Sequence, residues 1–354
     1  RTGQAAAMSI IVQKFGGTSV ASADKIARAA RRAIKAKLDG HQIVMVVSAM
    51  GHTTDELVDL ARQVNPNPPR REMDMLLTTG EQVSIALMAM AIAAAGHEAI
   101  SFTGGQVGLI TDDAHTKARI RSIDAERIHK ELRAGKVVIV AGFQGITEQG
   151  AITTLGRGGS DTTAVALAAA LKADVCEIYT DVDGVYTTDP RIVPRARKID
   201  RITCDEMLEL ASLGAGVMHS RSIEFGKKYN VPIHVRSSLT DIEGTLIVSA
   251  TAGMEGIVVR GVTLKKDLAR IVLVGVPNKP GVAAQIFARI AESNIVVDDI
   301  IQNVYGKGNE ANIGFTTSLA DFREAQNVCR QLAGEMKFKA VETDEQIAKV
   351  SIVG

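Results

Sequence analysis

The chain is 354 residues long, with 46% hydrophobic and only 3% aromatic residues and a formal net charge of +1. This length favours two domains, and a core of Ala, Val, Ile and Leu is typical of helices packed on a parallel sheet. The balanced charge argues against a nucleic-acid or membrane surface, and three distant cysteines without metal-ligand spacing (Cys176, Cys204 and Cys329) favour a reduced, cytoplasmic protein.

Residues 8–249 alternate short β-rich runs with amphipathic or alanine-rich stretches, which predicts an α/β layer structure with a mostly parallel sheet. We expect Met8 to be the initiator, because the residues before it lack the apolar run of a signal peptide. The expected strands are Ile10–Lys14, Gln42–Val47, Glu98–Phe102, Val137–Gly142, Val175–Thr180 and Ile233–Arg236. The expected helices are Ala23–Asp39, Asp55–Val64, Met73–Ala95, Asp124–Ala134, Asp161–Lys172 and Asp205–Leu213. The apolar run Val83–Ala95 is too short to span a bilayer and predicts a buried helix.

A second pattern occupies residues 264–345 and has the order βαββαβ, which is typical of a small ferredoxin-like module. Its expected strands are Ile271–Val276, Ile295–Val304, Ala311–Thr317 and Lys337–Glu342. Its expected helices are Val282–Ser293 and Asp321–Ala333. Lys349–Val353 begins another apolar strand, so residues 346–354 are expected to start a further domain.

The first motif, Lys14-Phe-Gly-Gly-Thr-Ser19, lies between a predicted strand and a predicted helix. Glycines at such a junction let backbone N–H groups approach phosphate oxygens, and a helix N-terminus favours negative charge. Lys14 adds a cation that can follow the charge as it moves from the γ-phosphate to the bridging oxygen. We expect a phosphate site here, although an ordinary turn with an exposed lysine is equally compatible with the glycines alone.

A second glycine-rich motif, Leu155-Gly-Arg-Gly-Gly-Ser-Asp161, precedes another predicted helix. Arg157 offers a planar fork that suits a carboxylate bidentately. We expect Ser160 or Asp161 to cap the helix while the glycines expose backbone donors. The motif predicts an anion site, and the alternative is a glycine-rich loop with a structural cap.

The segment Thr180–Arg191 follows a predicted strand and is rich in polar residues. Asp181 and Asp183 indicate turns and hydrogen bonding, whereas Tyr186 and Arg191 are candidates for holding the ring and phosphates of a nucleotide. A polar β-turn explains the same residues equally well.

Two more segments carry polar groups that are candidates for binding a small substrate. Ser48–Thr54 ends the second strand in a polar loop suited to a small substrate. Glu81 is a charge amid apolar neighbours, which is costly without a partner, so it is a candidate for a substrate ammonium unless it lies on a solvated helix face. His219 and His234 have no catalytic constellation around them, and we expect both to be structural.

Together these segments resemble the aspartate kinase family. The matching segments are Lys14–Val20, Val47–Leu57, Leu76–Glu81, Ala141–Gly145, Thr153–Thr163 and Tyr179–Arg191. The similarity runs from about Ile10 to Ser238, and the region after Leu264 resembles the first of the family's two ACT regulatory domains. The resemblance implies an αβα sandwich of the amino-acid-kinase type followed by a ferredoxin-like ACT domain, with ATP and aspartate meeting over the carboxyl ends of the strands.

The resemblance also implies the reaction, which is the ATP- and Mg²⁺-dependent phosphorylation of L-aspartate to 4-phospho-L-aspartate, the first step toward lysine, threonine and methionine. Lys14 and Asp161 would be the catalytic residues, with Asp161 orienting Lys14. The residues serving ATP would be Lys14, Gly16, Gly17, Ser48, Thr180, Asp181, Tyr186 and Arg191. Those holding aspartate would be Thr54, Glu81, Phe143, Arg157, Gly158, Gly159 and Ser160, with Arg157 on the α-carboxylate and Glu81 near the ammonium. No residue is assigned as a metal ligand, and no general base is needed because an ionised carboxylate has no proton to lose.

ACT domains of this family pair side by side and bind lysine, threonine or both at the seam, which implies a homodimer or higher oligomer. The counterparts of the effector-binding residues are Asn278, Lys279, Gly281, Val282, Ala283, Gln302 and Asn303. A regulatory fold that has lost its effector is the alternative. The chain departs from many relatives at Gly216, where they carry a lysine near the nucleotide.

Two other functions share features of this sequence. A kinase of the same fold acting on glutamate, acetylglutamate or a nucleotide would keep the glycine-rich loops, but Arg157 together with Glu81 favours a free amino acid. A non-catalytic amino-acid sensor would not need Lys14, Arg157 and Asp161, all of which are present.

Overall fold

The protein is described by a computed structural model that covers residues 9–249, 259–305 and 309–354. These residues form two compact units, one made of residues up to Gly261 together with Val353–Gly354, and one made of Val262–Ile352. The expected initiator Met8 lies outside the described residues.

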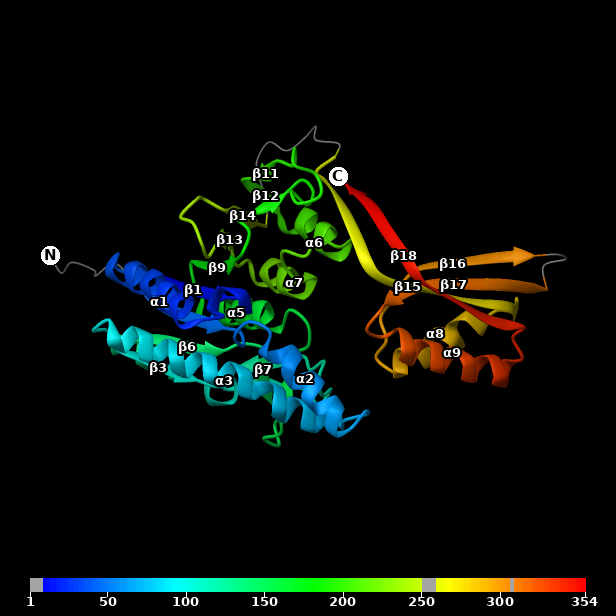
Figure 1. Ribbon diagram of the computed structural model, residues 1–354, viewed down its shortest axis with the longest axis horizontal. Helices are drawn as coiled ribbons and strands as arrows, with labels where there is room; N and C mark the ends of the chain where they lie inside the picture. The colour runs from blue at the N-terminus through cyan, green and yellow to red at the C-terminus, as the bar shows by residue number, and fades with distance from the viewer. Residues whose placement is uncertain (1–8, 250–258, 306–308) are drawn as a thin grey trace. The chain divides into compact units, whose positions relative to one another are not determined.

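The larger unit is built on an eight-stranded sheet of order β12-β14-β13-β9-β1-β2-β6-β3 (Figure 1). Its strands are β1 Ile10–Phe15, β2 Gln42–Val47, β3 Ala99–Phe102, β6 Val137–Ala141, β9 Val175–Thr180, β12 Arg201–Thr203, β13 Ile233–Ser237 and β14 Thr245–Val248. All neighbouring pairs are parallel except β13 with β14. The six strands predicted for this region are therefore confirmed, and the mostly parallel sheet with them.

Helices cover both faces of this sheet because successive strand residues point to opposite sides. Val44 and Val46 pack in one buried cluster with residues of α4 (Glu126–Arg133), α5 (Gly159–Leu171), α6 (Cys204–Ser212) and α7 (Ser220–Tyr229). Ile43 and Met45 pack in a second cluster with α1 (Ala23–Leu38) and α3 (Arg70–Ala94). The predicted αβα sandwich is confirmed.

Local sequence explains where several helices begin and end. Ser22 accepts a hydrogen bond from the backbone N–H of Lys25 at the start of α1, and Thr203 with Glu206 forms a capping box at the start of α6. The prolines of residues 65–69 separate α2 (Thr53–Val64) from α3, since proline cannot extend either helix.

Helix α3 is, within the described part of the chain, the one helix long and apolar enough to cross a membrane by length and composition. Of its most apolar stretch, 44% is buried inside the fold, and the helix packs on the sheet. Val83, Leu87 and Met90 are exposed, so the expected buried helix is buried on one side only.

Several elements are missing from the sequence prediction. A four-stranded sheet joins β4 (Leu109–Thr111), β5 (Ile120–Ile123), β7 (Gln144–Ile146) and β8 (Ile152–Thr154), and α7, β12 and β14 were not expected either. Strands of three or four residues are too short to show a clear alternation of polar and apolar residues. A two-stranded ribbon of β10 (Val185–Tyr186) and β11 (Lys198–Ile199) was missed for the same reason.

The smaller unit has the predicted order βαββαβ. Its elements are β15 Gly261–Pro277, α8 Val282–Glu292, β16 Val297–Tyr305, β17 Glu310–Ser318, α9 Phe322–Met336 and β18 Ala340–Val353. The sheet order β16-β17-β15-β18 is that of a ferredoxin-like fold. One expectation is wrong: Lys349–Val353 is not a separate strand, because β18 continues without a break through the polar residues before it, which an edge strand can expose to solvent. The assignment of residues 346–354 to a further domain stays a prediction.

Candidate active site

The order of the central sheet brings the predicted motifs together at the carboxyl ends of its central strands. Strand β1 lies between β2 and β9, and Phe15 is in register with both Val47 and Tyr179, so the three strands end side by side. The chain continues from β1 to its neighbour β2, and β9, which comes later in the chain, lies on the other side of β1. Such a reversal of strand order is the topological switch point where α/β proteins bind ligands. The segments that begin at Gly16, Ser48 and Thr180 therefore meet at this point.

Lys14 and Asp161 form an ion pair at the same carboxyl end of the sheet, with Lys14 Nζ 2.5 Å from Asp161 Oδ1. Each side chain is only 12% exposed, so water screens the pair weakly and the attraction is stronger than at the surface. Lys14 belongs to β1 and Asp161 to the first turn of α5. The structure thus joins the two glycine-rich motifs through a charge pair.

Helix α5 begins earlier than the sequence predicted, which changes the role of its first residues. Its N-cap is Gly158, in the left-handed conformation with φ 67°, and within the described part of the chain no side-chain hydrogen bond caps the helix. The expectation that Ser160 or Asp161 would be the cap is therefore wrong. The glycine-rich loop forms the helix start itself, because glycine adopts this conformation without steric cost, and the Asp161 carboxylate pairs with Lys14 instead.

Glycine is required where the loops of the site approach each other closely. A Cβ atom on Gly17 would lie 2.8 Å from the Ala49 carbonyl oxygen, and one on Gly158 would lie 2.2 Å from the Cβ of His219. Gly17 thus allows backbone to pack on backbone, and Gly158 allows the His219 side chain to pack on backbone.

Glu81 is buried in α3, with 2% of its surface exposed. Its Oε1 accepts a hydrogen bond from the Ala49 N–H at 3.1 Å, whereas Oε2 has no hydrogen-bond partner in the described part of the chain. Burial raises the pKa of Glu81 to about 7, and the bond from Ala49 opposes that rise. The solvated helix face considered from the sequence is excluded, and one carboxylate oxygen stays available beside the loop after β2.

Arg157 lies in the loop before α5 with an exposed side chain. The adjoining backbone is tied to the loop after β6, because the Leu155 N–H donates to the Phe143 carbonyl at 2.8 Å and the Phe143 N–H donates to Thr163 Oγ1 at 3.1 Å. Phe143 itself has φ 69°, an unusual value for a residue with a side chain. The exposed Arg157 cation thus extends from a backbone held by hydrogen bonds on either side.

The remaining predicted residues are placed as follows. Thr54 is half-buried in the first turn of α2, Ser48 is half-buried after β2, and Gly159 and Ser160 are buried at the start of α5. In the segment after β9, Thr180 donates to Asp181 at 3.1 Å and Tyr186 donates to Asp183 at 2.8 Å. The Arg191 fork binds Asp189, with donor–acceptor distances of 3.0 and 2.9 Å. These contacts are turn interactions, so the nucleotide roles of this segment stay predictions.

Sequence reasoning missed two residues that support the site, Arg221 and Asp74. His219, which was expected to be structural, packs on Gly158 and caps α7, and burial lowers its pKa. Arg221 donates to the Leu155 carbonyl at 3.0 Å, and Asp74 is fully buried beside β8. Asp74 shares with Glu81 the signal of a charge within the apolar helix α3, so the same argument applied along the whole helix would have found it.

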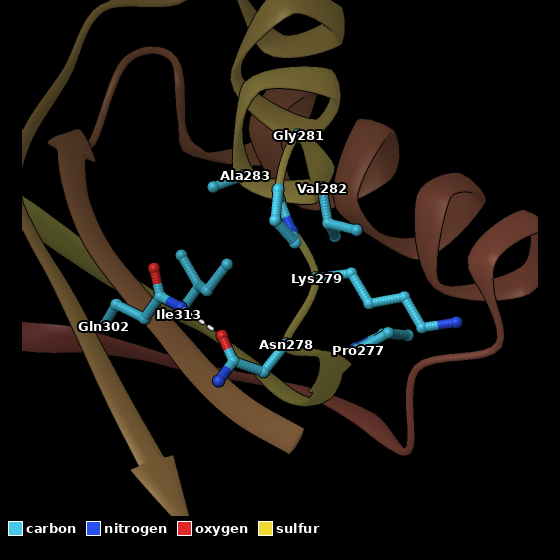
Figure 2. A pocket seen from close by; sticks show the side chains of 9 residues that line it. Pro277, Asn278, Lys279, Gly281, Val282, Ala283, Gln302 and Ile313 are labelled. Atoms are coloured by element: carbon cyan, nitrogen blue, oxygen red, sulfur yellow. Dashed lines mark hydrogen bonds between the residues drawn. The ribbon is translucent and has the colours of Figure 1, made fainter. Parts of the chain in front are cut away.

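Except for Asn303, the predicted effector residues of the smaller unit line a pocket of about 450 Å³ between the β15–α8 turn and the sheet (Figure 2). Its lining comprises residues 277–283 with Gln302 and Ile313. Gln302 Nε2 donates to Asn278 Oδ1 at 3.2 Å, and Lys279 extends away from Gln302 and Ile313. Asn303 is exposed and does not line the pocket, because neighbouring residues of a strand point to opposite faces.

Two further observations concern cations at the site. Within residues 9–249, 259–305 and 309–354, no three His, Cys, Asp or Glu side chains converge into a metal cage. A Cβ atom on Gly216 would meet no atom of the described residues within 4 Å, so the position has room for the start of a side chain.

Comparisons with known proteins agree with this geometry. Residues 9–237 match the amino acid kinase family, and residues 270–333 match the ACT domain. An aspartokinase of Bacillus sp. (strain MGA3) is 52% identical over 347 residues, which cover 98% of this chain and 84% of the relative. A solved aspartate kinase from Synechocystis is 48% identical with a TM-score of 0.63, over 98% of this chain and 60% of that one.

Escherichia coli aspartokinase III has been solved in two states that resemble this structure at 27% identity. Its complex with aspartate and ADP has a TM-score of 0.82 over 97% of this chain and 87% of that one. Its complex with lysine and aspartate has a TM-score of 0.72 over 97% and 86%.

Proposed function

Since the chain belongs to the amino acid kinase family, as an aspartate kinase, we propose that it transfers the γ-phosphoryl group of ATP to the side-chain carboxylate of L-aspartate, forming 4-phospho-L-aspartate. The observation that carries the proposal is the Lys14–Asp161 pair at the switch point of the sheet, flanked by two glycine-rich loops.

In the proposed mechanism Lys14 neutralises the charge that develops on the transferring phosphoryl group. Asp161 holds the amine in place from the start of α5, so little reorganisation accompanies the transfer. Gly16 and Gly17 let backbone N–H groups approach the phosphates, with Ser48 beside them, while Thr180, Asp181, Tyr186 and Arg191 surround the nucleotide.

The proposed aspartate site lies beside the phosphate site. Glu81 offers to the substrate ammonium a carboxylate oxygen that has no partner among the described residues, and Arg157 clamps the α-carboxylate bidentately. Thr54, Phe143, Gly158, Gly159 and Ser160 complete the wall. The side-chain carboxylate of aspartate is itself the nucleophile, so catalysis consists of alignment and charge neutralisation.

We propose that Mg²⁺ enters with ATP. Such an ion would keep most of its coordination on phosphate oxygens and water. The ion would neutralise phosphate charge alongside Lys14.

An acceptor assay tests the proposal. ADP formation from ATP is measured with aspartate, glutamate, acetylglutamate or UMP as the acceptor. We expect ADP formation with aspartate alone, trapped as an acyl phosphate, because Arg157 and Glu81 are suited to a free amino acid. Turnover with glutamate and none with aspartate would refute the assignment.

We further propose that the reaction is the first step toward lysine, threonine and methionine in the cytoplasm, and that lysine, threonine or both inhibit it through the ACT unit. The pocket lined by residues 277–283 and Gln302 supports the effector site, because the N-terminus of α8 suits an amino-acid carboxylate. Pairing of ACT units into a homodimer or higher oligomer would use β16, the edge strand that exposes Ile300, Ile301 and Val304. Titrating activity with each amino acid singly and together, with light scattering for the oligomeric state, tests both parts.

A further inference from the structure

Asp74 is a charged side chain that the proposed mechanism does not use, although its exposure to solvent is 0%. It lies on α3, seven residues before Glu81. Its carboxylate accepts from the Thr154 hydroxyl at 2.6 Å, from the Thr116 N–H at 3.1 Å to each oxygen, and lies 2.7 Å from His115 Nδ1. A buried carboxylate is stable only with such partners, so Asp74 holds three segments in one arrangement.

The first consequence of these contacts is the position of the loop that contains Thr116. This residue has φ 69°, which is rare for a β-branched residue, and both oxygens of Asp74 hold its N–H in that conformation. The Thr116 carbonyl then lies 2.9 Å from where a Cβ on Gly156 would be. The loop therefore packs directly against the residue that precedes Arg157.

The second consequence is that the backbone before Arg157 is bound on both sides. Thr154 is held by Asp74 through its hydroxyl and by the Ala118 N–H, which donates to its carbonyl at 2.9 Å. Arg221 donates to the Leu155 carbonyl at 3.0 Å and to the Ala118 carbonyl at 2.9 Å. The exposed Arg157 side chain thus starts from a backbone whose direction this network sets.

We propose that Asp74 is a positioning residue for aspartate, which acts by fixing the direction of Arg157 through Thr116 and Thr154. The proposal rests on the proposed function, in which Arg157 clamps the α-carboxylate. A bidentate clamp loses one of its two bonds when its base rotates. Loss of Asp74 therefore weakens aspartate binding and spares the nucleotide, which binds at the loops after β1 and β9.

The first test compares Asp74→Asn with Asp113→Asn, a matched control that removes an exposed carboxylate from the same loop. We expect Asp74→Asn to raise the KM for aspartate about tenfold, because a hydrogen bond to a charged group is lost, and to change the KM for ATP less than about twofold. Asp113→Asn should change neither. An unchanged KM for aspartate, or an equal rise in both KM values, overturns the proposal.

A second pair of variants covers the case in which Asp74→Asn does not fold. Thr154→Val removes only the hydroxyl that binds Asp74, and Thr154→Ser restores it. We expect the valine variant to reproduce the rise in the KM for aspartate and the serine variant to have a KM within about twofold of the parent. A valine variant with normal kinetics contradicts the proposal.

Arg157→Ala separates this proposal from the function on which it rests. If Asp74 acts through Arg157, the two substitutions are not additive, and Asp74→Asn adds little to the KM of Arg157→Ala. A full additional tenfold effect would refute the positioning role and leave the proposed function intact. A normal KM for aspartate in Arg157→Ala alone would refute the carboxylate clamp itself.

Discussion

Glu81→Gln is predicted to make the protein more stable at alkaline pH and a poorer aspartate kinase. Burial raises the pKa of Glu81 from its ordinary value of 4.5 to about 7. Because a pKa shift of one unit corresponds to about 1.4 kcal/mol, ionising this side chain costs about 3 kcal/mol more in the folded protein than in the unfolded chain. A glutamine keeps the acceptor for the Ala49 N–H and replaces the ionised oxygen with a neutral amide, whose missing partner costs about 1 kcal/mol.

The sign of the pH dependence follows from a folded-state pKa that exceeds the unfolded one. The folded protein holds the extra proton between about pH 4.5 and 7, so stability from protonated Glu81 is present below this window and is lost as the pH rises through it. The free energy of unfolding of Glu81→Gln should exceed that of the parent by about 2 kcal/mol at about pH 8 and should not exceed it at about pH 5. Urea denaturation without substrate measures both values.

Aspartate binding should change in the opposite direction to stability. Losing an ion pair with the substrate ammonium raises the KM for aspartate by about 10- to 100-fold, and in the parent the KM should rise as the pH falls below about 7 because Glu81 becomes protonated. Glu72→Gln is the control, since that side chain is 59% exposed on the same helix, and it should change neither quantity. A stability gain of equal size at both pH values, or an unchanged KM in Glu81→Gln, would refute the reasoning.

Four further predictions follow from the same site. Lys14→Ala should lower kcat by about a thousandfold or more with an unchanged circular dichroism spectrum, and near-normal turnover would remove Lys14 from the mechanism. Arg157→Lys should raise the KM for aspartate about tenfold because an ammonium cannot bind a carboxylate as a fork, so an unchanged KM would count against a bidentate clamp. Gly158→Ala should destabilise the protein by about 2 kcal/mol or more, measured by thermal unfolding, since its Cβ would meet His219 in a left-handed conformation; a wild-type melting temperature would contradict this. Removing Mg²⁺ with EDTA should abolish turnover and excess Mg²⁺ should restore it, whereas persistent activity would show that the phosphates need no divalent ion.

The sequence was informative about elements with a long, regular pattern. The strand–helix alternation over residues 10–236 and the βαββαβ order after Leu264 are both present in the structure. These elements are predictable because each buries a continuous apolar face, whose period is visible in the sequence. The short strands β4, β5, β7 and β8 have only three or four residues each, too few to show such a period, and the uninterrupted β18 pairs with β15 in the sheet.

At the candidate site, too, some features were predictable from the sequence and others were not. Lys14, Arg157 and Glu81 stand out in the sequence because glycine-rich junctions and a charge in an apolar helix have direct chemical meaning. The cap of α5 was mispredicted, because the helix starts from Gly158, which has a left-handed conformation and packs closely on His219. No local sequence pattern predicts that contact.

By itself, then, the sequence determined the two folds, the positions of the glycine-rich loops and the residue types available there, since propensity and periodicity act over neighbouring residues. Only the tertiary structure decided that Asp161 pairs with Lys14, that Glu81 keeps one oxygen without a partner among the described residues, and that a network around Asp74 fixes the backbone beside Arg157. These outcomes join residues many positions apart along the chain, and hydrogen bonds and buried charges depend on distances of a few ångströms that only the packed fold sets.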